Sequence, residues 1–188
     1  MMKGITSTIA GIILVLTSLP SLADNWNRGK LEADVSGGEQ VINTTVDGAT
    51  LPVTGLVSAS IGEAHFRVSH DGNSLNYTLK VSVLPGTPIF MAHIHLGPKG
   101  QNGPIILWLF GDNSNSPIGP LVRDDGPFTG EISGVLTAAD LFPQPSLGLN
   151  TFSDAIKNIM AGNAYVNVHT VAHPPGEIRG QIHDDHDH

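Results

Sequence analysis

The segment from Met91 to Gly103, MAHIHLGPKGQNG, decides how the chain is interpreted, because apolar and polar residues alternate along its first half. Successive side chains of an extended strand point to opposite faces. Ala92 and Ile94 would then share one face, and His93 and His95 the other. The apolar face can pack on a hydrophobic core, while the two imidazoles lie roughly 6–7 Å apart on the opposite face. The pattern therefore predicts a half-buried strand that carries a pair of imidazoles.

A second histidine-bearing segment lies near the C-terminus, AYVNVHTVAH from Ala164 to His173. Its valines alternate with polar residues, which predicts another strand with one apolar face. We expect the two strands to lie close together and to aim three imidazoles at one metal ion. The candidate ligands are His93, His95 and His169, with His173 as the candidate fourth.

The donor types limit which metal such a site would hold. The chain has no cysteine, so its ligands must be nitrogen, oxygen or thioether groups. Neutral imidazole binds copper and zinc, and the affinity order favours Cu²⁺ over Zn²⁺. Met91 lies on the expected histidine face, where its thioether would suit Cu(I). We therefore expect copper, with zinc as the alternative; in the other interpretation, His93 and His95 only orient the loop of residues 97–103.

The first 23 residues have the three parts of a secretory signal peptide. Lys3 precedes an apolar run through Leu16, and Ser21-Leu22-Ala23 ends the segment with small residues at the right spacing. The run is short for a membrane span of about 20 residues. We expect cleavage after Ala23, a periplasmic or secreted location, and no membrane span in the mature chain.

Composition excludes several classes of function. The 188 residues are 40% hydrophobic and 14% charged, which suits one globular domain. Loss of Lys3 with the signal peptide would change the formal charge from −8 to −9, and such a surface repels nucleic acid and anionic membranes. No serine–histidine–acid or cysteine nucleophile arrangement stands out. An enzymatic role is therefore not our first expectation.

Short alternating segments separated by turns dominate the rest of the chain. The clearest is a hairpin with strands at 64–68 and 75–83, and residues 104–110 form an apolar run typical of a buried strand. One short helix is predicted from Ser153 to Ala161, with Ser153 as its N-cap. These signals predict an all-β fold, an antiparallel β-sandwich or barrel with one short helix.

Two motifs resemble the CHRD domain, a family named from chordin and widespread in bacterial exported proteins. They are HIHLGPKGQNGP at 93–104 and AYVNVHTVAHPPGEIRGQI at 164–182. The resemblance implies an immunoglobulin-like β-sandwich related to Cu,Zn superoxide dismutase. We expect a signal peptide at 1–23, a leader at 24–30, the domain at 31–183, and an acidic histidine-containing tail at 184–188. That tail is either a weak chelating patch or a solvated terminus.

The dismutase likeness extends to the candidate ligands. His93-Ile94-His95 resembles the strand motif whose two histidines hold copper, and His169 resembles the later-strand histidine that completes the copper site. Residues 111–127, however, contain no histidine for the dismutase zinc site, and the disulfide is absent. An efficient dismutase is not expected on these grounds.

Glu177 and Arg179 alternate with Ile178 in the GEIRG motif. We expect both to share a face opposite the core and to form a cross-strand ion pair. An alternative role for Arg179 is to guide an anion to a metal ion, which would favour the dismutase.

Three hypotheses follow from the sequence. The first is an exported copper-binding protein for metal buffering, delivery or resistance. The second is a non-catalytic extracellular interaction module with an exported protein partner, and the third is a dismutase-like redox enzyme.

Overall fold

The computed structural model describes residues 29–46, 49–83, 89–111 and 129–185. The expected signal peptide, most of the expected leader and the last three residues of the expected tail lie outside the described residues. No helix in the described ranges is long and apolar enough to span a membrane.

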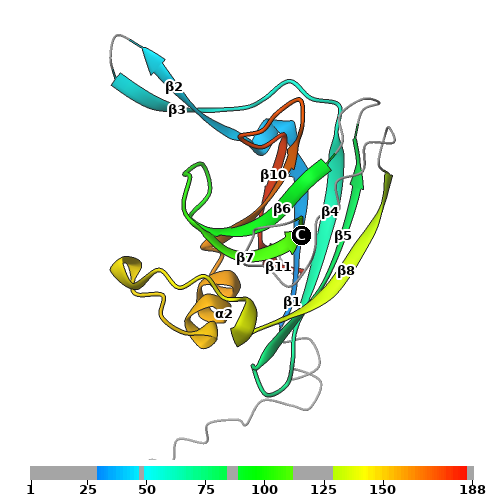
Figure 1. The fold of residues 1–188 in the computed structure, drawn as a ribbon, viewed down its shortest axis with the longest axis vertical. Helices are drawn as coiled ribbons and strands as arrows, with labels where there is room; N and C mark the ends of the chain where they lie inside the picture. The colour runs from blue at the N-terminus through cyan, green and yellow to red at the C-terminus, as the bar shows by residue number, and fades with distance from the viewer. Residues whose placement is uncertain (1–28, 47–48, 84–88, 112–128, 186–188) are drawn as a thin grey trace, which may run out of the picture.

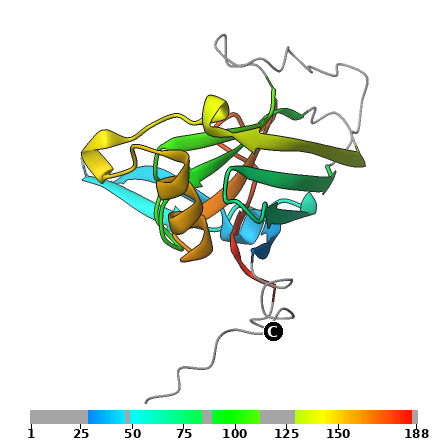
Figure 2. The ribbon, with the colours of Figure 1, turned by 90° about the horizontal axis from the view of Figure 1, so that it is seen from below.

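Most of the described strands belong to one large antiparallel sheet (Figure 1). The strand order is β7-β6-β9-β10-β1-β4-β5-β8, with β11 paired to β1, and β7 approaches β8 so that the sheet nearly closes. Seen along the long axis, the sheet curls back on itself (Figure 2). This confirms the predicted all-β fold. The strands are β1 (Lys30–Ser36), β4 (Ile61–Val68), β5 (Ser74–Ser82), β6 (Ile89–Leu96), β7 (Ile105–Phe110), β8 (Thr129–Thr137), β9 (Ala164–Thr170), β10 (Ile178–Gln181) and β11 (His183–Asp184).

A separate two-stranded hairpin, β2 (Val41–Val46) and β3 (Ala49–Thr54), extends from this sheet (Figure 1). Its first residues lie over the loop between β6 and β7, because the Asn102 amide donates to the Val41 carbonyl at 3.1 Å.

The hydrophobic core lies between the facing halves of the curled sheet. In β4, Ala64 and Phe66 are buried while His65 and Arg67 are exposed, as the alternation predicts. The expected hairpin is confirmed as β4 and β5, paired from Ile61↔Ser82 onward. Tyr77 of β5 reaches across the interior, where its hydroxyl donates to the Leu109 carbonyl of β7 at 2.6 Å. This bond joins the two halves.

The predicted helix is confirmed as α2 (Phe152–Met160), with one correction at its start. Thr151 is the N-cap instead of Ser153: its hydroxyl accepts from the Asp154 amide, and the Asp154 carboxylate accepts from the Thr151 amide. The buried face of α2 includes Ala155, whereas Met160 stays 46% exposed. Three short 3₁₀ helices complete the described structure: η1 (Gly37–Glu39), η2 (Ala138–Asp140) and η3 (Pro145–Leu147).

The strands at the two ends of the domain extend one residue beyond each expected bound. Lys30, expected in the leader, begins β1, and Asp184, expected in the tail, belongs to β11. Asp184 pairs with Leu31, and His183 pairs with Glu32. The last short strand thus ties the two ends of the domain together.

We predict that Tyr77→Phe lowers the free energy of unfolding by about 1–3 kcal/mol, because it removes a buried hydrogen bond across the interior. Urea denaturation measures this difference. Val135→Ala, on the 57% exposed Val135 of neighbouring β8, is the control and should change stability by less than about 0.5 kcal/mol. Equal effects of the two changes would contradict a bridging role for Tyr77.

Candidate metal centre

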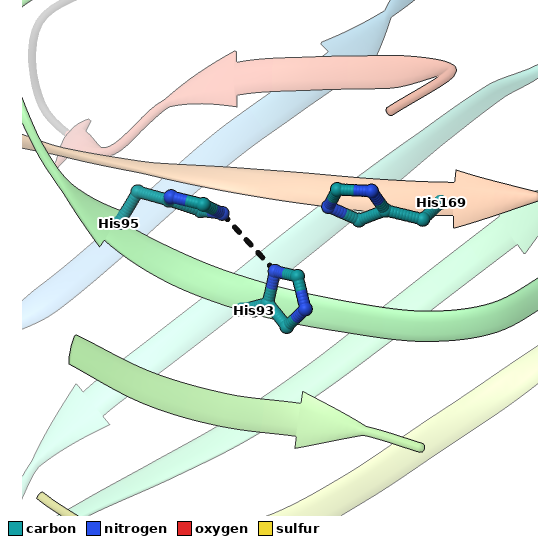
Figure 3. A group of neighbouring side chains, drawn as sticks. All are labelled: His93, His95 and His169. Atoms are coloured by element: carbon teal, nitrogen blue, oxygen red, sulfur yellow. Dashed lines mark hydrogen bonds between the residues drawn. The ribbon is translucent and has the colours of Figure 1, made fainter. Parts of the chain in front are cut away.

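Strands β6 and β9 are antiparallel neighbours, and their register brings the three expected histidines into one group (Figure 3). Met91 lies opposite His169, and His93 lies opposite Asn167. One ring nitrogen from each of His93, His95 and His169 lies within 4.8 Å of the others. Two strands that are distant in the chain therefore place three imidazoles around one point.

The rings are closely packed and surrounded by aromatic side chains. His93 Nδ1 lies 3.0 Å from His95 Nε2 (Figure 3), and the ring centroids of His93 and His169 are 4.6 Å apart. Trp108 of β7 packs edge-on against His93 at 4.4 Å between centroids. His93 and His169 are 1% and 5% exposed, so this environment shields them from water.

Two backbone carbonyls fix the proton positions on His95 and His169. His95 Nδ1 lies 2.8 Å from the Gly103 carbonyl oxygen, and His169 Nδ1 lies 2.8 Å from that of Pro174. A carbonyl oxygen only accepts hydrogen bonds, so both Nδ1 atoms carry the proton. Each Nε2 of the neutral rings therefore presents a lone pair. The Nε2 of His169 is buried and has no hydrogen-bond partner in the described structure.

His93 has a lone pair without a donor whichever ring nitrogen carries its proton. A neutral imidazole carries one proton. On Nδ1, that proton would be donated to His95 Nε2 and would leave His93 Nε2, which is buried and unpartnered among the described residues, with an unused lone pair. On Nε2, it would leave two lone pairs facing each other across 3.0 Å. In the second arrangement neither of the two facing lone pairs has a donor, and a shared metal ion would supply the missing positive charge.

Burial keeps the three rings uncharged. Burial, with help from the neighbouring imidazoles, lowers the pKa of His93 to about 2. Burial also lowers the pKa of His95 to about 4, against the opposing effect of the Gly103 carbonyl, and it lowers the pKa of His169. At neutral pH no proton must leave these nitrogens before a cation binds.

The remaining described histidines lie outside this group, whereas Met91 lies beside it. His173 is not part of it; it lies half-buried in the β9–β10 turn, near enough to Glu177 to influence that carboxylate electrostatically. His65 and His70 are exposed. Met91 is the register partner of His169 and stays a candidate. His183, the last residue of the expected domain, belongs to β11, whereas the tail histidines His186 and His188 lie outside the described residues.

Glu177 and Arg179 correct the prediction of a surface ion pair. Both are 1% exposed, and they bind different partners. Glu177 accepts hydrogen bonds from three hydroxyl groups, whereas Arg179 donates to the loop between β6 and β7 and lies over the Tyr165 ring. The prediction was wrong because alternation shows that the two residues share a face but does not show that loops cover that face.

A family model for the CHRD domain matches residues 31–182. The chain belongs to the CHRD-domain family. This confirms the resemblance of the two histidine motifs, which both lie inside the matched range. It also supports an extracellular or secreted module. No curated protein and no solved structure is a significant match to this CHRD-domain chain.

We predict that the metal-free protein loses stability as the pH falls below about 6.5, the ordinary pKa of histidine. The folded-state pKa of the buried histidines is lower, so in this range the unfolded chain binds protons that the folded chain does not. The slope of the free energy of unfolding against pH approaches about 1.4 kcal/mol per pH unit for each such histidine. Urea titrations with a chelator between pH 7 and 5 measure it.

In this experiment His93→Asn should flatten the slope relative to the parent protein. A slope that is the same in both proteins would show that His93 is not held neutral by burial.

Proposed function

We propose that this CHRD-domain protein binds one copper ion, or alternatively zinc, through His93, His95 and His169. The exported protein would serve in metal buffering, delivery or resistance. The observation that carries the proposal is the convergence of three ring nitrogens, one of them the buried Nε2 of His169, which has no hydrogen-bond partner in the described structure. Burial of an unpartnered acceptor costs about 1–3 kcal/mol, and a bound cation would remove that cost.

The donor set supports copper first. All three groups are imidazoles, and the affinity order favours Cu²⁺ over Zn²⁺ at nitrogen ligands. Two of them also donate Nδ1–H to backbone carbonyls, which is the usual arrangement around a metal-binding histidine. Three protein ligands would leave a position open for exchange with water or another carrier, as buffering or delivery requires.

We predict that the mature protein binds one Cu²⁺ per chain and that His93→Ala/His95→Ala weakens binding by more than about 100-fold, beyond the cost of an outer-sphere change. The double variant removes two of the three nitrogens. Competition against a chromogenic chelator, with elemental analysis, measures affinity and stoichiometry for Cu²⁺, Cu(I) and Zn²⁺.

Two controls separate this site from other histidines. His65→Ala/His70→Ala changes two exposed residues, and His186→Ala/His188→Ala removes the tail chelators; both should keep the parent affinity. His173→Ala tests the candidate fourth ligand. An unchanged metal content in His93→Ala/His95→Ala would disprove the proposal.

The second candidate function is a metal-free interaction module in which the histidines brace two loops. It is favoured by the hydrogen bonds that His95 and His169 donate to Gly103 and Pro174, which would stabilise those loops without any ion. The two functions differ in thermal unfolding. We predict a higher melting temperature with one equivalent of copper, whereas the module hypothesis predicts no shift and a specific exported protein partner.

The dismutase hypothesis has lost the feature that favoured it. The guanidinium of Arg179 is buried and donates to loop carbonyls, so it is not directed toward an incoming anion. A superoxide assay on copper-loaded protein, with free histidine–copper as the reference, tests the remaining redox role.

A further inference from the structure

Arg179 of β10 holds the loop of residues 97–103, which joins β6 to β7. Its guanidinium donates to the Gln101 carbonyl at 2.8 Å, the Pro98 carbonyl at 3.4 Å and the Asn102 side-chain oxygen at 3.1 Å. It also lies 3.4 Å from the centroid of the Tyr165 ring. One buried cation thus contacts three residues of the loop, Pro98, Gln101 and Asn102, which suits the rigid fork of arginine.

This loop ends at Gly103, whose carbonyl orients His95. The Gly103 carbonyl accepts from His95 Nδ1, and the Gly103 amide donates to the Tyr165 hydroxyl at 3.1 Å. The Tyr165 ring stacks on the His95 ring, 4.9 Å between centroids and 8° between planes. A Cβ at Gly103 would overlap the Leu96 carbonyl, so the backbone passes too closely for any other residue. Arg179 and His95 are therefore linked both through the loop and through Tyr165.

Glu177 holds the second loop, the turn of residues 171–176 between β9 and β10. Its carboxylate accepts from the Thr170 hydroxyl at 2.5 Å, a bond that closes the base of the turn. The hydroxyls of Ser58 and Ser60 donate to its other oxygen at 2.6 and 2.5 Å. Burial would raise the pKa of Glu177, but these three hydrogen bonds outweigh it and keep the carboxylate ionised.

The turn contains Pro174, whose carbonyl orients His169. The Pro174 carbonyl, which accepts from His169 Nδ1, lies between Thr170 and Glu177. The His173 amide donates to both the carbonyl and the hydroxyl of Thr170, and the Gly176 amide donates to the His173 carbonyl. The position of the Pro174 carbonyl thus depends on the hydrogen bond between Thr170 and Glu177 at the base of the turn.

We propose that Glu177 and Arg179 are the positioning residues of the metal centre, each acting on one histidine: Arg179 sets His95 through the 97–103 loop, and Glu177 sets His169 through the 171–176 turn. This inference deepens the proposed function and rests on it for the metal. The positioning itself exists without a metal, because the hydrogen bonds that carry it lie within the protein. The two charged residues of the GEIRG motif therefore position two different histidines.

Because each of these residues is expected to affect only one histidine, the two effects can be measured separately. In metal-free protein, ¹H–¹⁵N long-range NMR spectra distinguish an Nδ1–H from an Nε2–H imidazole. We expect the parent to show Nδ1–H at both His95 and His169. Arg179→Lys, which keeps a charge but loses the fork, should perturb the His95 tautomer and leave His169 unchanged. Glu177→Gln should perturb His169 and leave His95 unchanged.

The same variants are then measured for copper binding by chelator competition. Each should weaken the affinity by about 10–100-fold, the usual cost of losing an outer-sphere partner. The matched controls are Arg67→Lys in β4 and Glu131→Gln in β8, which change the same residue types at exposed positions. Both controls should keep the parent tautomers and affinity.

Two smaller changes keep the test valid if a buried charge proves essential for folding. Tyr165→Phe removes only the hydroxyl that accepts from Gly103, and Thr170→Val removes only the hydroxyl that closes the turn. They should reproduce the effects of Arg179→Lys on His95 and of Glu177→Gln on His169.

Nδ1–H spectra that stay unchanged at both histidines in every folded variant would overturn the positioning role. So would variants that always disturb both rings together. If the selective spectra are seen while the parent binds no copper, the positioning role stands and the proposed metal function fails.

Discussion

The donation of Nδ1–H from an imidazole to a backbone carbonyl, made once by His95 and once by His169, is the constraint on which the site depends. Each bond fixes a tautomer and directs the opposite nitrogen toward the centre of the group. Without them either ring could rotate or exchange its proton position, and the lone pairs would no longer converge. The covering loops therefore have a chemical role as well as a protective one.

The curled sheet explains how this arrangement is stable. Its interior face is a conventional apolar core, formed by residues such as Ala92, Ile94 and Val168. The opposite face of β6, β9 and β10 is also buried, but it is polar and is covered by loops and by the start of the β2–β3 hairpin. A buried polar face requires nearly complete hydrogen bonding. Glu177 and Arg179 achieve this through several bonds each, whereas His93 and His169 each keep a nitrogen without a partner among the described residues.

Much of the fold and part of the candidate site could be predicted from local sequence. Alternation along Ala64–Val68 and around His93 identifies strands and their buried faces, because the side-chain period of a strand is a local property. The pairing of β6 with β9 could be proposed only because both strands carry histidines. The bonds of Arg179 to residues 98–102, and the cap at Thr151 in place of Ser153, depend on where loops fold back in space. Periodicity contains no information about such contacts.

If three imidazoles from two strands share one ion, the X-ray absorption spectrum of the copper-loaded protein will reveal them as its ligands. We expect a first shell with three imidazole nitrogens at about 2.0 Å, the usual metal–histidine distance, and the same spectrum when the tail histidines are replaced. A shell with one imidazole and mainly oxygen ligands, or a spectrum that changes when the tail is altered, would contradict it.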